Sequence, residues 1–386
     1  MPADRRAAMR FIVCLGVVSL FADMTYEGAH SAVGPLLENL GASAAVVGFV
    51  AGFGEMIAAS LRYFSGKVAD STRAYWTLTF AGYAINLIVV PALALVGSWQ
   101  AAALLVIAER TGKALRGPAR DVLLSEATEV VGHGWGFGIH AAMDQTGAVI
   151  GPLLVAASVA RSHRFGPAFL WLAVPAALTL VALSLARLAR PVRGTPPPSR
   201  EPQQLPPVFR TYVIGAGLIA VGFIDFPLLA YHFQQTALFA PADIPLLYAG
   251  AMAINGITAL VYGRLFDRFG VVVLALGLLL SMLALPLGLL FGPAGAIAAV
   301  ACWAAGLGVQ DATLRSGISQ VVSMNKRGNA FGIFNGVYGV MWFVGSAVMG
   351  LLYAHALVAL VVFGVAFQFA ASMVFFRLRT RLATAS

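Results

Sequence analysis

Charged residues are scarce in this chain. Only 11% of its 386 residues are Asp, Glu, Lys or Arg, while 60% are hydrophobic; soluble domains carry roughly 25% charged residues. A single soluble core cannot enclose so much apolar surface, so the composition predicts a chain that faces lipid. The two cysteines, Cys14 and Cys302, each lie in an apolar run without metal or redox spacing, and we expect small core residues there.

Motifs of the common enzyme classes are also missing. The sequence contains no metalloprotease spacing, no Ser/His/Asp set and no phosphate-binding glycine loop where it could act. Gly136-Phe137-Gly138 indicates the start of a helix rather than a nucleotide loop. Without a large soluble domain there is no ATPase, so energy would come from an ion or solute gradient. We therefore expect no enzyme and no cofactor; an intramembrane enzyme or a non-transporting receptor is the less favoured class.

Long apolar segments, by contrast, are abundant. A membrane-spanning helix needs about 20 apolar residues, and twelve segments qualify. They cover residues 10–37, 44–65, 75–97, 99–118, 135–160, 167–188, 210–235, 243–262, 271–291, 293–314, 329–353 and 355–376. The pattern predicts an all-α membrane protein with 12 transmembrane helices. No small-residue cleavage site follows the basic start, so we expect the first segment to be a retained helix and not a signal peptide.

Basic residues predict the orientation of these helices. If the N-terminus is cytoplasmic, nearly all loop arginines and lysines fall on the cytoplasmic side, and the outer loops hold only Arg161 and Arg164. The positive-inside rule then places both termini in the cytoplasm. We expect a multi-pass protein of a bacterial inner membrane, surrounded by the lipid bilayer. The net charge of +9 follows the inner loops, so no nucleic-acid partner is expected.

A polar stretch divides the helices into two sets of six. Residues 191–209 are rich in proline and arginine, which predicts a cytoplasmic linker between bundles at 1–190 and 210–386. Short motifs recur about 195 positions apart in the two bundles. They are Gly66–Asp70 and Gly263–Asp267, Phe137–Ile139 and Phe331–Ile333, and Arg120 and Arg315. Duplicated halves are typical of alternating-access carriers that bind a small-molecule substrate between the halves of one chain, so we expect a monomer.

These motifs resemble those of the major facilitator superfamily. Gly66–Asp70, followed by Arg73, is similar to the family's loop after the second helix, and Gly263–Arg268 is its copy in the second half. Arg110 stands where the family has its membrane-embedded arginine. Gly147–Pro152 is similar to the glycine-proline signature of the family's proton-driven exporters. The resemblance implies the major facilitator fold and a transporter of the drug:proton antiporter type.

The sequence departs from the family's pattern in three places. Ser71 stands where the first loop usually has a basic residue, and Arg73 displaces the glycine that normally follows. Ala114 and Leu115 replace the glycines that trail the arginine of the fourth helix. The glycine-proline segment of the fifth helix lacks its final small pair. The loop copy in the second half is closer to the pattern.

Loop and helix-packing residues suggest a gate. Asp70 can accept hydrogen bonds from the next helix and pair with cytoplasmic arginines, which would latch the two bundles together; alternatively it only caps a helix. Small residues in the fifth helix would let it approach a neighbour and bend, for export or as ordinary packing, as at Gly48 and Gly52. The predicted gating residues are Gly66, Asp70, Arg73, Arg120, Gly147, Gly151, Pro152, Gly263, Asp267, Arg268 and Arg315.

Ionisable side chains at bilayer depth are costly, which makes each one a functional candidate. Asp23, Glu27 and His30 share one face of the first helix, and that face has to point into the protein. The predicted proton-coupling residues are Asp23, Glu27, Glu55, Glu109 and Asp144, with Arg110 as the positive partner. The pairs of Glu55 with Arg62 and of Glu109 with Lys113 can also be purely structural.

The second half of the chain is poorer in titratable groups and richer in aromatic ones. We expect it to supply an adaptable apolar wall for the substrate, while protons are handled in the first half. The predicted substrate-binding residues are His30, Arg110, His140, Asp225, Tyr231, His232, Tyr338 and Trp342.

Three hypotheses for the cargo follow. The leading one is proton-coupled export of a small amphipathic molecule or drug. The second is export of a divalent metal ion, for which the oxygen and imidazole ligands would be Asp23, Glu27, His30, His140, Asp144, Asp225 and His232. The third is uptake of an anionic metabolite, held by Arg110, Lys113 and Arg116. No resident metal ion is expected in any case.

Overall fold

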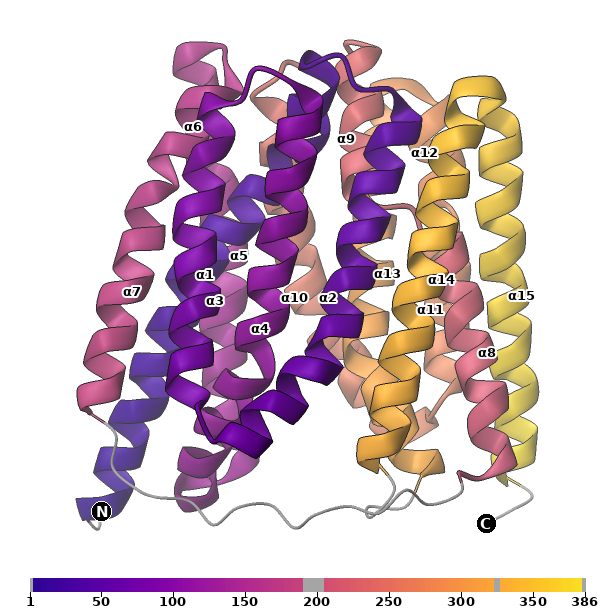
Figure 1. Cartoon of the computed structure of the whole chain (residues 1–386). Coiled ribbons are helices and arrows are strands. Elements are labelled where there is room, and N and C mark those ends of the chain that lie inside the picture. Colours follow the sequence, from indigo (N-terminus) through magenta and orange to yellow (C-terminus); the bar gives the residue numbers. More distant parts are fainter. Residues whose placement is uncertain (1–2, 190–204, 323–326, 384–386) are drawn as a thin grey trace. The chain divides into compact units, whose positions relative to one another are not determined.

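The computed structural model of the chain describes residues 3–189, 205–322 and 327–383. Every regular element in these ranges is a helix, and no strand occurs in them, so the predicted all-α fold is confirmed. Within each part of the chain the long helices run roughly alongside one another (Figure 1). The α-helices are α1 (Ala3–Asn39), α2 (Ala44–Thr72), α3 (Tyr75–Ala92), α4 (Trp99–Val131), α5 (His133–Ser162), α6 (Phe165–Trp171), α7 (Ala173–Leu188), α8 (Pro207–Gly222), α9 (Phe226–Gln235), α10 (Asp243–Phe269), α11 (Val272–Ser281), α12 (Ala284–Leu290), α13 (Gly292–Val321), α14 (Arg327–His355) and α15 (Leu357–Ala383).

Eleven segments of the described chain are long and apolar enough to cross a membrane. Four of them are interrupted helices, namely α3 with the short 3-10 helix Leu93–Leu95, α6 with α7, α8 with α9, and α11 with α12. Large apolar side chains such as Ile88 and Leu104 stay 69% and 68% exposed, as expected for residues that face lipid. The chain is a multi-pass membrane protein, as predicted.

The remaining predicted span, 99–118, falls within α4, a helix of 33 residues. This helix is not among the eleven apolar spans because it carries Glu109, Arg110, Lys113 and Arg116 within about two turns. The predicted linker 191–209 lies for most of its length outside the described residues, and α8 begins at Pro207.

The described residues form two compact units. Unit 1 takes its residues from Met1–Gly41, Ile57–Pro197 and Ala240–Ala249, and unit 2 from Ala42–Met56, Pro198–Phe239 and Gly250–Ser386. Each unit is mainly one half of the sequence. Two helices are exceptions, since the first half of α2 belongs to unit 2 and the start of α10 belongs to unit 1.

Each unit has its own apolar core. In unit 1, residues such as Phe11, Leu123 and Leu183 of α1, α4 and α7 pack together. In unit 2, Tyr212 of α8 packs against Phe375 of α15, and its buried hydroxyl donates to the carbonyl oxygen of Leu314 on α13 at 2.7 Å. These cores fix the helices that carry the polar side chains of the interior.

Candidate functional site

Helices α1 and α5 pack unusually closely because α5 presents glycines to α1. A Cβ atom at Gly147 would overlap the carbonyl oxygen of Leu20, and one at Gly151 would overlap that of Met24. Glycine at these positions therefore lets the two backbones touch, which is how small residues act in membrane helix pairs. This contact sets the distance between the acidic side chains that α1 and α5 carry.

Asp23 of α1 and Asp144 of α5 form a carboxyl pair. The two side chains are partly buried and hydrogen-bonded to each other. An ionised carboxylate can only accept hydrogen bonds, so a bond between two carboxyl groups requires a proton on one of them. The two carboxyl groups therefore lie close enough in the interior of unit 1 to share a proton when one of them is protonated.

Two cations stand beside this pair. Lys113 of α4 interacts with both carboxyl groups, and Arg120 of α4 interacts with both as well. The Nη1 of Arg120 donates to the hydroxyl of Ser19 at 3.1 Å, and Ser19 is 2.8 Å from Nε2 of His140. Lys113 and Arg120 thus place positive charge next to the carboxyl pair.

Arg110, the predicted positive partner of the acids, lies in a second cluster of unit 1. Its guanidinium donates to Nδ1 of His30 at 2.8 Å, is 3.8 Å from the carboxylate of Glu109 and lies 4.7 Å from the ring centre of Tyr26. Since an arginine can only donate, Nδ1 of His30 must carry a lone pair and the imidazole is neutral in this arrangement. The amide of Asn86 donates to Glu109 at 3.2 Å.

Glu27 is tied to the start of α10. The hydroxyl of Tyr248 donates to Oε2 of Glu27 at 2.6 Å, and the ring of Tyr248 lies 5.7 Å from that of His30. Tyr248 belongs to unit 1 although it comes from the second half of the sequence. Glu27 thus contacts a different helix from Asp23, only one turn along α1.

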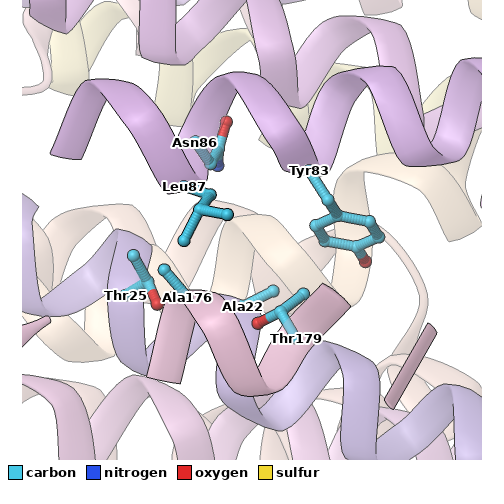
Figure 2. A pocket seen from close by; sticks show the side chains of 7 residues that line it. All are labelled: Ala22, Thr25, Tyr83, Asn86, Leu87, Ala176 and Thr179. Carbon is cyan, nitrogen blue, oxygen red and sulfur yellow. The ribbon is translucent and has the colours of Figure 1, made fainter. Parts of the chain in front are cut away.

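A small cavity lies between α1, α3 and α7 (Figure 2). It is lined by Ala22, Thr25, Tyr83, Asn86, Leu87, Ala176 and Thr179. The hydroxyl of Tyr83 and Oδ1 of Asn86 are buried there and make no hydrogen bond within the described chain. The space holds at most a single water molecule and is too small for an organic substrate, and Oδ1 of Asn86 faces Gly112 of α4 instead.

In unit 2 the predicted residues fall into two groups. The carboxylate of Asp225 accepts from Nε1 of Trp342 at 2.7 Å and from the hydroxyl of Ser346. The ring of Tyr338 is tilted against that of Trp342, with ring centres 5.6 Å apart, and its hydroxyl donates to Gln310 at 2.7 Å. Around them Phe223, Phe226 and Trp303 make further ring contacts.

The second group lies along α9 and α14. Nδ1 of His232 is 2.8 Å from the hydroxyl of Tyr353, and the ring of Tyr231 meets that of Tyr353 at 5.6 Å. Glu55, a predicted proton-coupling residue, belongs to unit 2 as part of the first half of α2 and interacts with the hydroxyl of Tyr338.

The predicted gating residues are placed differently from one another. Asp70, Asp267, Arg268 and Arg315 are exposed, and Asp70 accepts a hydrogen bond from Tyr75, the first residue of α3. Arg73 has a left-handed backbone, with φ of 53°, in the turn between α2 and α3. A Cβ added at Gly66 would make only ordinary contact with Pro118, and nothing lies within 4 Å of a Cβ added at Gly263. Pro152 lies inside α5 directly after Gly151.

Arg120 is a predicted gating residue that is partly buried and close to the carboxyl pair. The predicted fourth span ends at residue 118, two residues before Arg120. In the structure α4 continues to Val131, and Arg120 lies beside the Asp23–Asp144 pair. Sequence reasoning also missed Ser19, although its position one turn before Asp23 places it on the same face of α1.

No group of three His, Cys, Asp or Glu side chains in the described ranges is arranged to hold a metal ion. The hypothesis of a metal-ion cargo therefore has no donor set within those residues.

Comparisons with known proteins agree with this architecture. The family described as Major Facilitator Superfamily matches residues 15–346. An uncharacterised protein of Mycobacterium tuberculosis is 40% identical over 384 residues, which covers 97% of this chain and 94% of that protein. An uncharacterised MFS-type transporter of Methanocaldococcus jannaschii is 24% identical over 366 residues, which covers 90% of this chain and 89% of that protein.

Solved structures share the fold. The crystal structure of the nucleoside transporter NupG superimposes with a TM-score of 0.73 at 14% sequence identity, covering 95% of this chain and 98% of that one. At this identity the likeness concerns the fold and not the substrate. Family match and fold together show that the chain belongs to the major facilitator superfamily and is a transporter, not an enzyme.

Proposed function

We propose that the protein exports small amphipathic molecules in exchange for protons, by alternating access. In this proposal twelve membrane helices, α4 included, form two six-helix halves of a monomer in a bacterial inner membrane, with both termini cytoplasmic. The observation that carries the proposal is the hydrogen-bonded pair of Asp23 and Asp144 next to Lys113 and Arg120. A proton-driven carrier needs one such group that is protonated on one side of the membrane and deprotonated on the other.

The neighbours of the pair suit this cycle. While the pair holds a proton it carries one negative charge next to the two cations of α4. Loss of the proton makes the net charge of this site less positive by one, which makes the interior more favourable for an amphipathic cation. Binding of a cationic substrate and binding of the proton would therefore oppose each other.

Support for export comes from the contact between α1 and α5. The glycine-proline segment that resembles the signature of proton-driven exporters is the segment that brings Asp144 to Asp23. Rings of unit 2, among them Trp303, Tyr338 and Trp342, offer apolar and cation–π surface for the cargo.

Proton exchange can be tested on purified protein in liposomes loaded with a pH-sensitive dye. Ethidium and tetraphenylphosphonium serve as probe cations. We expect a pH gradient to drive uptake of either cation, and we expect Asp23→Asn and Asp144→Asn to reduce that uptake at least about tenfold, which corresponds to about 1.4 kcal/mol. Exchange of labelled for unlabelled cation without a gradient should persist, because it needs no proton.

The matched control is Asp121→Asn. Asp121 also accepts from Arg120, at 3.0 Å, but its side chain is 55% exposed and it lies outside the carboxyl pair. Its variant should keep gradient-driven uptake. Full coupling in both Asp23→Asn and Asp144→Asn would contradict the assignment of the proton site, and failure of the wild type to move either cation would contradict the proposed cargo.

Anion uptake is the second candidate, because of Arg116. Its side chain is 2% exposed, it lies over the ring of Tyr83 at 4.4 Å, and its Nη1 makes no hydrogen bond within the described residues. A bound anion would satisfy this buried donor. Stabilisation of the purified protein against heat by organic anions, lost in Arg116→Gln, would favour this candidate, whereas stabilisation by tetraphenylphosphonium favours cation export.

A further inference from the structure

The span formed by α8 and α9 is broken in its middle. It is the most deeply buried of the eleven apolar spans in the described chain, yet α8 ends at Gly222 and α9 begins only at Phe226. In a continuous helix Pro227 would lack the N–H that bonds to the carbonyl of Phe223, and its ring would clash with that carbonyl, which accounts for the break. Helix interruptions inside membranes are tolerated where other groups satisfy the freed backbone.

Side chains of two other helices satisfy that backbone. Nε2 of Gln368 on α15 donates to the carbonyl oxygen of Gly222 at 3.0 Å, and Nε1 of Trp303 on α13 donates to that of Ile224 at 2.8 Å. The hydroxyl of Ser281 on α11 in turn donates to Gln368. The break is therefore a built feature, held in place by three neighbouring helices.

Asp225 lies in this break and reaches to α14. Its side chain does not cap α9 but accepts from Trp342 and Ser346, and the residue is only 6% exposed. Both donors are neutral, and each adds a hydrogen bond that an ionised carboxylate accepts more strongly than a protonated one. The strength of the link between the broken helix and α14 therefore depends on whether Asp225 carries a proton.

Ser346 also contacts the first half of α2. A Cβ atom at Gly48 of α2 would overlap the carbonyl oxygen of Ser346, and one at Gly52 would lie 2.7 Å from its Cβ. Gly350, one turn further along α14, approaches Gly48 with the same closeness, at 3.2 Å between a Cβ built on Gly350 and the Cα of Gly48. The first half of α2 and α14 thus cross through small residues with their backbones in contact.

We propose that Asp225 is a second proton-binding site, and that its ionisation holds α14 in the position on which the first half of α2 packs. The ionised carboxylate accepts from Ser346 and Trp342 and keeps Ser346 against Gly48 and Gly52. A protonated Asp225 has one acceptor fewer, which loosens Ser346 and the crossing. The second half of α2 belongs to unit 1, so the change reaches a helix that both units share. A role for this change in transport rests on the proposed proton coupling, whereas the experiment that tests the change itself does not.

Other titratable groups near this region lie on α2, α9, α13 and α14. The hydroxyl of Tyr338 on α14 interacts with Asp225, with Asp311 of α13 and with Glu55 of α2. Asp311 accepts from Asn255 of α10 at 3.2 Å, and on α9 itself His232 is bound to Tyr353 of α14. A test therefore has to distinguish the titration of Asp225 from that of Glu55 and Asp311.

The packing of α2 on α14 can be followed by cross-linking. Phe49 and Phe343 have ring centres 5.3 Å apart across this contact, so Phe49→Cys and Phe343→Cys are combined in a background with Cys14→Ser and Cys302→Ser. A short bis-maleimide is applied to the protein in lipid nanodiscs at acid and alkaline pH, and the cross-linking rate is divided by the rate at which a monofunctional maleimide labels the same cysteines at that pH, because the thiolate is the reacting form. We expect this normalised cross-linking rate to be about fivefold higher at alkaline pH, the effect of roughly one hydrogen bond.

Asp225→Asn should abolish this pH dependence, whereas Glu55→Gln and Asp311→Asn should leave it in place. Ser346→Ala should also abolish the pH dependence of cross-linking. In this variant Asp225 should still titrate, which is detected in difference infrared spectra as the carbonyl stretch of a protonated carboxyl group. An unchanged pH dependence in Asp225→Asn, or infrared spectra identical to the wild type's in that variant, would overturn the proposal. Neither readout needs a cargo. A failure of the proposed transport would be seen in the uptake assays of the Asp23 and Asp144 variants, so it can be told apart from a failure of the proposal for Asp225.

Discussion

Gly151→Ala is expected to lower the melting temperature of the detergent-purified protein by about 5 °C or more, and Gly147→Ala to act in the same direction. In each variant the added methyl group overlaps a backbone oxygen of α1, at Met24 or Leu20, which cannot swing away as a side chain would. Overpacking costs about 1–3 kcal/mol, and each kcal/mol corresponds to roughly 2–4 °C. Tryptophan fluorescence during heating would measure it.

Gly138→Ala is the control on the same helix. A Cβ atom there would meet nothing within 4 Å, so the variant should melt within about 1 °C of the wild type, or slightly higher because alanine favours helix. Since Met24 follows Asp23 directly, Gly151→Ala should also disturb the carboxyl pair and reduce gradient-driven uptake. Equal melting of the Gly151 and Gly138 variants would refute backbone contact between α1 and α5.

Arg110→Gln is expected to be the most destabilising side-chain change. The guanidinium is 2% exposed and lies between His30, Glu109 and Tyr26. Removing one partner of a buried charge pair costs about 3–5 kcal/mol because the other charge stays buried, which predicts a loss of about 10 °C in melting temperature. Tryptophan fluorescence during heating would measure the melting temperature of this variant as well.

A double variant tells this electrostatic cause from a loss of packing. Glu109→Gln combined with Arg110→Gln removes both charges and keeps an oxygen that can accept from Asn86, so it should melt higher than Arg110→Gln alone. Arg268→Gln, which alters an exposed arginine over the ring of Phe269, should melt within about 1 °C of the wild type. Additive losses in the double variant would mean that Glu109 and Arg110 do not stabilise each other.

Much of the architecture could be predicted because a helix that crosses lipid needs a long apolar segment, and such segments are visible in the sequence. Each predicted span coincides with a helix or a helix pair of the structure, including 99–118 in α4. The spacing of Gly147 and Gly151 predicted a close helix neighbour, which is α1. These features depend on residues near one another in the sequence, where periodicity and side-chain size decide the outcome.

The partners of the acids could not be predicted in the same way. Arg110, Lys113 and Arg120 lie on one long helix, and their spacing does not show how far α4 is rotated or shifted against α1. The packing of α4 on its neighbours places Lys113 and Arg120 beside Asp23 and Asp144, and Arg110 beside Glu109. For Asp225, Gly222 and Pro227 were a local sign of a broken helix, but the donors Trp342 and Ser346 are distant in the sequence.

The division of α2 between the units bears on how the protein is made. Helices enter the membrane in chain order, N-terminal parts first. Gly48 and Gly52 of α2 therefore reach the bilayer long before α14, whose Ser346 and Gly350 they pack against. Until the ribosome has delivered α14, this glycine face is open to lipid or to chaperones of the insertion machinery. Folding of the second helix is thus completed only near the end of synthesis, and a chain that stops before α14 leaves that face without its partner.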